Sequence, residues 1–262
     1  MRTFTRITIA TVAVSALILA GWARVEAQTT WEAGLKGGVG FSKLSGSGLS
    51  DTEPFFADLG GGFTAQGSLT AGLGDMRAGF MGGGYLLAHV TPSFGVRLEA
   101  LYASKGTKGD NSGSIGIYDA LNVFQGAVDV SGTNTITLNY FELPLLAVMY
   151  FPSGPTGKFE VFAGPAFAFK TSAESKSELT LSAGGSSDTE SATEDISDQV
   201  ADTDFGGVLG VGYSHKTSNA ILSIDLRWTQ GFSKVDDSGG ADWKNQNLSL
   251  MVGVGFPMGG TK

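Results

Sequence analysis

The last regular segment of the chain, residues 247–256, alternates between apolar and small or polar side chains. One parity holds Leu248, Leu250, Val252, Val254 and Phe256, and the other holds Asn247, Ser249, Met251, Gly253 and Gly255. Because successive side chains of a β-strand point to opposite faces, this pattern predicts a strand with one continuously apolar face. Its ten residues and aromatic end also match the dimensions of a strand that crosses a bilayer.

Seven earlier segments show comparable alternation, so that eight strands are predicted in all. They cover residues 31–41, 76–90, 94–103, 135–151, 159–170, 205–213, 221–232 and 247–256. The connections that follow the second, fourth and sixth strands are short turns rich in Pro, Gly, Ser or Asn. The other connections are long, which puts every long loop at one end of the molecule and both termini at the other.

The alternation of short and long connections predicts an all-β protein, an eight-stranded antiparallel up-and-down transmembrane β-barrel with long loops outside. Closure requires residues 247–256 to pair with residues 31–41, with Val252 and Val254 toward lipid and Gly253 and Gly255 toward the lumen. Aromatic residues fall near the strand ends, as membrane interfaces favour. We expect an inner belt of Trp31, Phe94, Phe151, Phe159, Tyr213 and Phe256, and an outer belt of Phe41, Tyr102, Tyr140, Phe169, Phe205, Trp228 and Trp243.

The N-terminal residues differ from the rest of the chain. Arg2 and Arg6 precede an apolar run over residues 7–20, and a small-residue cleavage pattern ends at Ala27. This predicts a cleaved signal peptide over residues 1–27 and a barrel domain over residues 28–262, with an uncleaved membrane anchor as the alternative. No later segment approaches the 18 or so apolar residues of a transmembrane helix.

Composition excludes several function classes. The net charge of −8 offers no basic stripe for nucleic acid, and the absence of Cys excludes disulfides and thiolate chemistry. The segment 172–204 has nine acidic residues and one Lys, which predicts a solvated loop that is mobile at its tip. A calcium site among these carboxylates is the alternative, although they lack the ligand spacing of an EF-hand loop.

Charged residues on the parity opposite the apolar one are expected to face the lumen. They are Glu32, Lys36, Arg97, Glu99, Glu142, Glu160, Lys170, Asp225 and Arg227. An eight-stranded barrel is just wide enough to be filled by side chains, and buried charges need partners. We therefore expect a structural plug of ion pairs, with a gated narrow pore or proton path as the alternative. Pro144 within a strand predicts a local bulge.

Catalysis is not expected. The only two histidines, His89 and His215, fall near the short turns at the inner end of the predicted barrel. Lipid-hydrolysing barrels of this size generally place their His and Ser near the outer leaflet. Gly-rich stretches such as residues 82–84 lie within strands, with no following helix to hold a phosphate. We expect no catalytic residue, no cofactor and no metal site.

Three motifs carry a resemblance to a known family. They are Tyr-Phe-Glu-Leu-Pro-Leu-Leu at residues 140–146, Arg-Leu-Glu-Ala-Leu-Tyr at residues 97–102, followed by Lys105 and Gly106, and Phe-Glu-Val-Phe-Ala-Gly-Pro at residues 159–165. With these motifs the chain resembles the small outer-membrane β-barrel domain family, porin-like barrels of the OmpA/OmpX type. The resemblance implies residence in the outer membrane of a Gram-negative-type cell, contact with its lipid, and insertion by the barrel-assembly machinery. The chain departs from the common pattern because residues 257–262 follow Phe256, so that machinery would read an internal signal.

Three functions remain open from the sequence. The first is a structural or surface-interaction role, in which long acidic loops contact a ligand or partner that the sequence does not identify. The second is a narrow porin-like channel for passive transport of small solutes. The third is a soluble periplasmic ligand-binding barrel.

Overall fold

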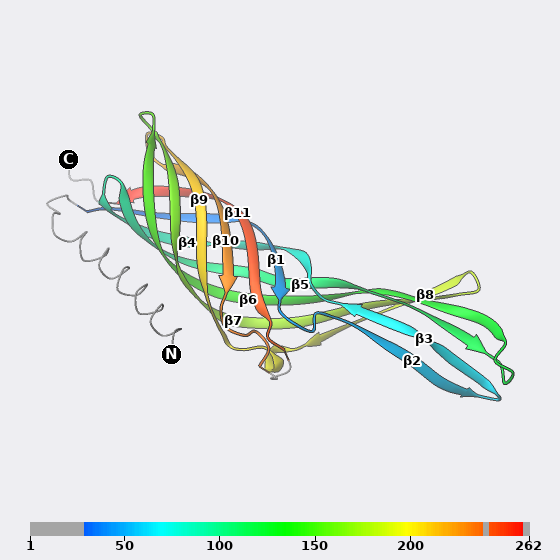
Figure 1. Cartoon of the computed structure of the whole chain (residues 1–262). Helices are drawn as coiled ribbons and strands as arrows, with labels where there is room; N and C mark the ends of the chain where they lie inside the picture. Colours follow the sequence, from blue (N-terminus) through cyan, green and yellow to red (C-terminus); the bar gives the residue numbers. More distant parts are fainter. Residues whose placement is uncertain (1–28, 238–240, 259–262) are drawn as a thin grey trace, which may run out of the picture.

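The computed structural model describes residues 29–237 and 241–258, which form an antiparallel β-barrel that continues at one end into a long flat sheet (Figure 1). The barrel strands are β1 (Thr30–Ser45), β4 (Asp75–Thr91), β5 (Phe94–Tyr118), β6 (Phe124–Ser153), β7 (Gly157–Ala183), β9 (Thr203–Lys216), β10 (Ile221–Gly231) and β11 (Lys244–Met258). Each pairs with the next, and β11 pairs with β1, so the predicted ring of eight strands is confirmed. The predicted signal peptide lies outside the described residues. Within them, no helix has the length and apolar character needed to span a membrane.

The closing pair of strands is the predicted one, β1 with β11. Partners run without a break from Trp31↔Met258 to Ser45↔Lys244. Val252 is exposed on the outer face, whereas Gly255 is buried on the lumen side. A Cβ at Gly255 would lie 2.2 Å from a carboxylate oxygen of Glu32 and 2.3 Å from the Tyr85 hydroxyl. A side chain at this point of the lumen wall would therefore displace Glu32 or Tyr85.

The outer face of the barrel is apolar, as contact with lipid hydrocarbon requires. It exposes Leu35, Val39, Phe80, Leu98, Leu145, Val161, Leu209, Ile224 and Leu250, among others. Trp31, Phe151, Phe159 and Phe256 are exposed at the inner end, and Phe41, Phe169, Phe205 and Trp228 toward the outer end. Two residues predicted for the outer belt are not in it. Tyr140 is buried in the lumen, and Trp243 packs against the apolar cluster that contains Tyr140.

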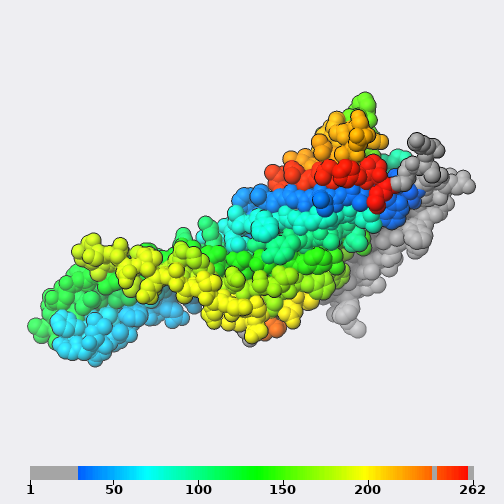
Figure 2. All heavy atoms as spheres, turned by 180° about the vertical axis from the view of Figure 1, so that it is seen from behind, coloured from blue at the N-terminus to red at the C-terminus, as the bar shows by residue number. Residues whose placement is uncertain are grey.

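The predicted long loops are largely wrong, because the chain there continues as strands. β5, β6 and β7 run 25, 30 and 27 residues, far beyond their predicted ends. Two further strands, β2 (Ser50–Gly60) and β3 (Phe63–Gly72), form a hairpin that pairs with β5, and β8 (Ser186–Asp195) pairs with β7. Figures 1 and 2 show this six-stranded sheet projecting from the barrel. We call its residues 50–72, 109–134 and 174–195 the extension.

The acidic segment 172–204 illustrates the physical reason for this difference. Alternating residues such as those at 178–182 (Glu-Leu-Thr-Leu-Ser) suit a strand once a neighbour is present to pair with them. β7 has β6 on one side and β8 on the other there, with Leu181 opposite both Val130 and Asp188. Pairing with β6 and β8 thus stabilises β7 as a strand where its local composition predicts a loop. Apart from the turn at Gly184 and Gly185, the irregular residues lie near the return to the barrel, around a short 3-10 helix, η2 (Ser197–Gln199).

The predicted bulge at Pro144 is also wrong. Pro144 faces Ala166 of β7, and β6 shifts its register against β7 between Asn139 and Tyr140 instead. Proline has no backbone N–H to donate, and Pro144 lies in a gap in the pairing of β6 with β5, between Leu98↔Leu145 and Leu101↔Glu142. The strand tolerates proline by omitting ladder pairs rather than by inserting a residue.

Side chains fill the middle and the outer part of the lumen. An apolar cluster closes the outer end, where Val200 and Val235, from the irregular connections, pack with Leu44, Leu138 and Tyr140. A second apolar cluster, which includes Leu146, Val148 and Phe162, lies nearer the inner end. Charged residues occupy the space around these clusters.

Candidate functional site

Six charged side chains from four strands meet in the middle of the lumen. They are Lys36 on β1, Arg97 and Glu99 on β5, Glu160 on β7, and Asp225 and Arg227 on β10. Each occupies the inward parity of its strand, and none is more than 5% exposed. We call them the central cluster.

Glu99 holds the central cluster together. Its Oε1 lies 2.9 Å from Lys36 Nζ and 3.0 Å from Arg97 Nε, and its Oε2 lies 2.7 Å from Arg227 Nη2. Lys36 also donates to Asp225 at 2.7 Å, and Arg97 donates to Glu160 at 3.3 Å. Three cations thus face three carboxylates, so the cluster is formally neutral. The two guanidinium groups flank the Phe162 ring, at 4.5 and 5.6 Å from its centroid, which adds cation–π attraction.

The other three residues predicted for the lumen lie outside this cluster. Glu142 pairs with Lys105 toward the outer end. Lys170 lies nearer the outer rim, where its ammonium donates to the carbonyl of Ser197 at 2.5 Å and pairs with Asp202 at 3.0 Å. Glu32 lies at the inner end, where it accepts a hydrogen bond of 2.6 Å from the Tyr85 hydroxyl and lies 3.3 Å from His89. The nine residues therefore form one cluster and three separate contacts.

Sequence reasoning missed several lumen residues. Lys105 shares the parity of Arg97 and Glu99, and extension of the third predicted strand by two residues would have revealed it. Tyr85, Tyr150 and Phe162 are also buried in the lumen, and the search for charged residues on the inward parity passes over them because they are aromatic.

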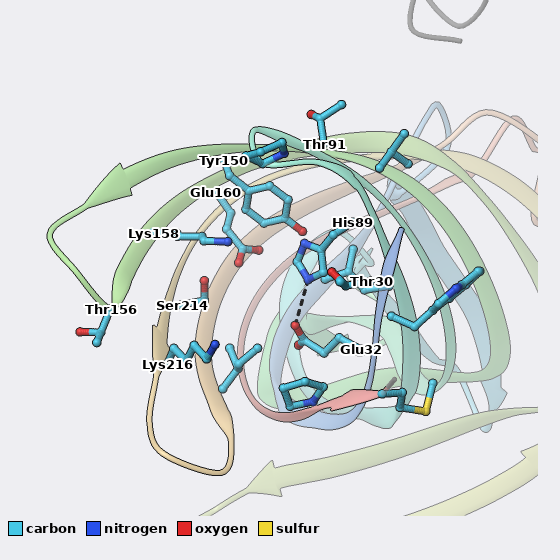
Figure 3. Close-up of a pocket in the computed structure, with 17 residues that line it drawn as sticks. Thr30, Glu32, His89, Thr91, Tyr150, Thr156, Lys158, Glu160, Ser214 and Lys216 are labelled. Carbon is cyan, nitrogen blue, oxygen red and sulfur yellow. Dashed lines mark hydrogen bonds and ion pairs between the residues drawn. The ribbon is translucent and has the colours of Figure 1, made fainter. Parts of the chain in front are cut away.

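The inner mouth of the lumen contains a cavity of about 460 Å³. The ends of seven barrel strands line it, and Figure 3 shows Tyr150, Glu160 and His89 around its opening. His89 therefore lies at the inner end, as predicted, and its ring stacks at a tilt on Tyr150 with centroids 5.3 Å apart. In the part of the chain that the structure describes, no three His, Asp or Glu side chains are grouped to hold a metal ion.

The extension has a strongly acidic composition and an apolar tip. Its three segments contain twelve Asp and Glu and one Lys, a net charge of −11, whereas the whole chain carries −8. Hydrogen bonds from Ser197 lower the pKa of the Asp195 carboxyl, which keeps that residue charged near the base of β8. At the far end, the turns after β2 and β5 touch at Gly62 and Ala120. Exposed apolar side chains surround this contact: Phe56, Leu59, Phe63, Leu121, Val123 and Phe124.

Comparisons with known proteins bear on the fold. The family model described as outer membrane protein beta-barrel domain matches residues 26–237. Ail, the attachment invasion locus protein of Yersinia pestis, is 16% identical with a TM-score of 0.34, over 86% of this chain and 98% of Ail. The N-terminal β-barrel domain of Pseudomonas aeruginosa OprF is 14% identical with a TM-score of 0.34, over 88% of this chain and 100% of that domain. No curated protein matches the chain.

Proposed function

Because the chain belongs to the outer membrane protein β-barrel domain family, we propose that it is a surface-binding protein whose barrel anchors the acidic extension outside the cell. Residence in the outer membrane rules out the soluble periplasmic barrel, whose exterior would have to be polar. The barrel-assembly machinery remains the expected partner during insertion.

The observation that carries this proposal is the continuation of three barrel strands into a laterally paired sheet. β5, β6 and β7 lead from the lumen wall to the tip without a break, and β2, β3 and β8 widen the sheet. A paired sheet holds its side chains in fixed positions, so a partner that binds there loses less entropy than one that orders a loop. An eight-stranded membrane anchor needs no such structure for its own stability.

The negative charge and the apolar tip of the extension indicate the chemistry of its partner. A net charge of −11 repels nucleic acids and other polyanions and attracts a cationic partner over distances near the Debye length, about 8 Å at physiological salt. Exposed side chains such as Phe56, Leu121 and Phe124 offer apolar area that a solvated surface would avoid. The partner we propose is therefore a protein or peptide with both basic and apolar residues.

The lumen is proposed to be a structural plug rather than a channel or an active site. Paired charges occupy its middle and an apolar cluster packs at its outer end, which supports a closed lumen. His89 is engaged with Glu32, and its ring packs against Tyr150. The protein is accordingly proposed to be non-enzymatic.

Binding to the purified protein in nanodiscs tests the proposal. We expect a cationic amphipathic peptide to bind, an oligolysine of equal charge to bind more weakly, and heparin not to bind. Neutralisation of β8 by D188N, E190Q and E194Q should reduce the association rate and its salt dependence. Substitution of the tip by F56S and L121S should increase the dissociation rate with little change in salt dependence.

A variant in the barrel serves as the control for peptide binding by the extension. The variant L250S alters the lipid-facing side of the barrel and should leave peptide binding unchanged, provided that the protein still inserts. Equal binding of heparin and the cationic peptide, or equal binding by the wild type and both extension variants, would refute the surface-binding role.

A further inference from the structure

The cavity at the inner mouth contains a buried donor that lacks a partner. Tyr150 is 3% exposed, and its hydroxyl makes no hydrogen bond to any residue that the structure describes. A buried polar group without a partner destabilises the folded state, so such groups are rare without a reason. Figure 3 shows the Tyr150 side chain at the edge of the cavity opening, with its hydroxyl directed toward His89.

Two ammonium groups lie beside the same cavity. Lys158 Nζ is 5.0 Å from the centroid of the Tyr150 ring, and Lys216 lines the rim. Neither lysine has a carboxylate within 4.0 Å among the described residues. The mouth therefore holds three hydrogen-bond donors that are free to meet an anionic group: one phenol and two ammoniums.

Two carboxylates line the inner part of the cavity wall. Glu32 is held by Tyr85 and His89, and Glu160 is held by Arg97. Both are at most 5% exposed, and a carboxylate with two oxygens can accept further hydrogen bonds. The charge of Glu160 is already balanced in the central cluster, where it pairs with Arg97, so Lys158, Lys216 and Glu32 leave the wall polarised, with the cations at the rim. A ligand that carries both charges can meet the lysines and the glutamates at once, which a simple anion cannot.

We propose that this cavity binds a small zwitterion, a molecule of amino-acid or dipeptide size with one carboxylate and one ammonium. The carboxylate of the ligand accepts hydrogen bonds from Tyr150 and Lys158, and its ammonium faces Glu32 and Glu160. The volume of about 460 Å³ lies in the range of small-molecule sites. This site is at the opposite end of the barrel from the extension, so the proposal of zwitterion binding does not depend on the surface-binding role.

Titration of the full chain in detergent micelles with alanyl-alanine tests this proposal. Binding is followed by calorimetry, with propionate, ethylamine and inorganic phosphate as comparison probes. We expect the dipeptide to bind more tightly than any of the three. Y150F removes only the hydroxyl and should weaken binding about tenfold, as the loss of one hydrogen bond to a charged group does. K158Q, at the half-exposed rim, should weaken binding to a similar degree.

The control variant is Y102F, which alters an outward-facing tyrosine and should bind the dipeptide like the wild type. Heat-modifiable migration on gels verifies that each variant is folded. The proposal is overturned by absence of dipeptide binding at millimolar concentration, by phosphate that binds as tightly as the dipeptide, or by unchanged affinity in both Y150F and K158Q.

Discussion

Replacement of Glu99 by glutamine removes one negative charge from the centre of the lumen without a change of shape. The three cations Lys36, Arg97 and Arg227 then face only Asp225 and Glu160, and one positive charge remains uncompensated at a site with no solvent exposure. Loss of one partner from a buried ion pair typically costs about 3–5 kcal/mol. Because Glu99 contacts all three cations, we expect E99Q to lie near the upper part of this range, at about 4 kcal/mol.

Urea unfolding in detergent micelles measures this effect. With a denaturant slope of about 2 kcal/mol per M, a loss of 4 kcal/mol lowers the midpoint by roughly 2 M. The control is E53Q on the exposed strand β2, which should change the free energy of unfolding by less than about 0.5 kcal/mol.

A compensating variant separates charge balance from local packing. R227M removes one cation, so the double variant E99Q/R227M is again neutral and should be less destabilised than the sum of the two single variants. An E99Q midpoint within about 0.3 M of the wild type would refute the reasoning that the cluster stabilises the barrel through charge balance.

Three further predictions follow from particular residues. G255V should destabilise the barrel by about 1–3 kcal/mol in urea unfolding, because its side chain would overlap Glu32 and Tyr85, whereas V252I on the outer face should be nearly neutral. L250K should cost about 2–4 kcal/mol in lipid bilayers, near the value for a charge at the bilayer midplane, and a loss below 1 kcal/mol would mean that Leu250 does not face hydrocarbon. Asp195 should titrate by NMR below its ordinary pKa of 3.8, so the stabilisation from its hydrogen bonds to Ser197 is complete above that pH and is lost as the pH falls through the lowered value. S197A should return this titration only part of the way to the ordinary range, because the backbone N–H at position 197 still donates to the carboxylate.

Alternation along single strands predicted the barrel well, because the two faces of a barrel strand meet opposite environments. The pairing of residues 247–256 with 31–41 follows from parity and strand count alone. Parity also separated inward residues such as Glu99 and Arg227 from outward ones such as Leu98 and Trp228, which the structure buries and exposes respectively.

The extension could not be predicted in the same way, since both faces of its sheet meet water. Segments such as β8 have no apolar parity, and every residue of β8 is exposed. β8 forms a hairpin with β7, and β7 in turn pairs with β6, a segment that is distant in the sequence. Contacts within the lumen had the same limit: parity placed Lys36 and Asp225 on inward faces, but their 2.7 Å pair joins residues 189 positions apart.

Conductance of the purified protein in planar lipid bilayers tests most directly whether the barrel is an anchor or a channel. The ion-paired cluster around Glu99 and the apolar outer end predict no steady ion steps at neutral pH. Reproducible steps from the wild type, with a selectivity that changes in R97Q, would contradict the closed lumen and make transport the function of the protein.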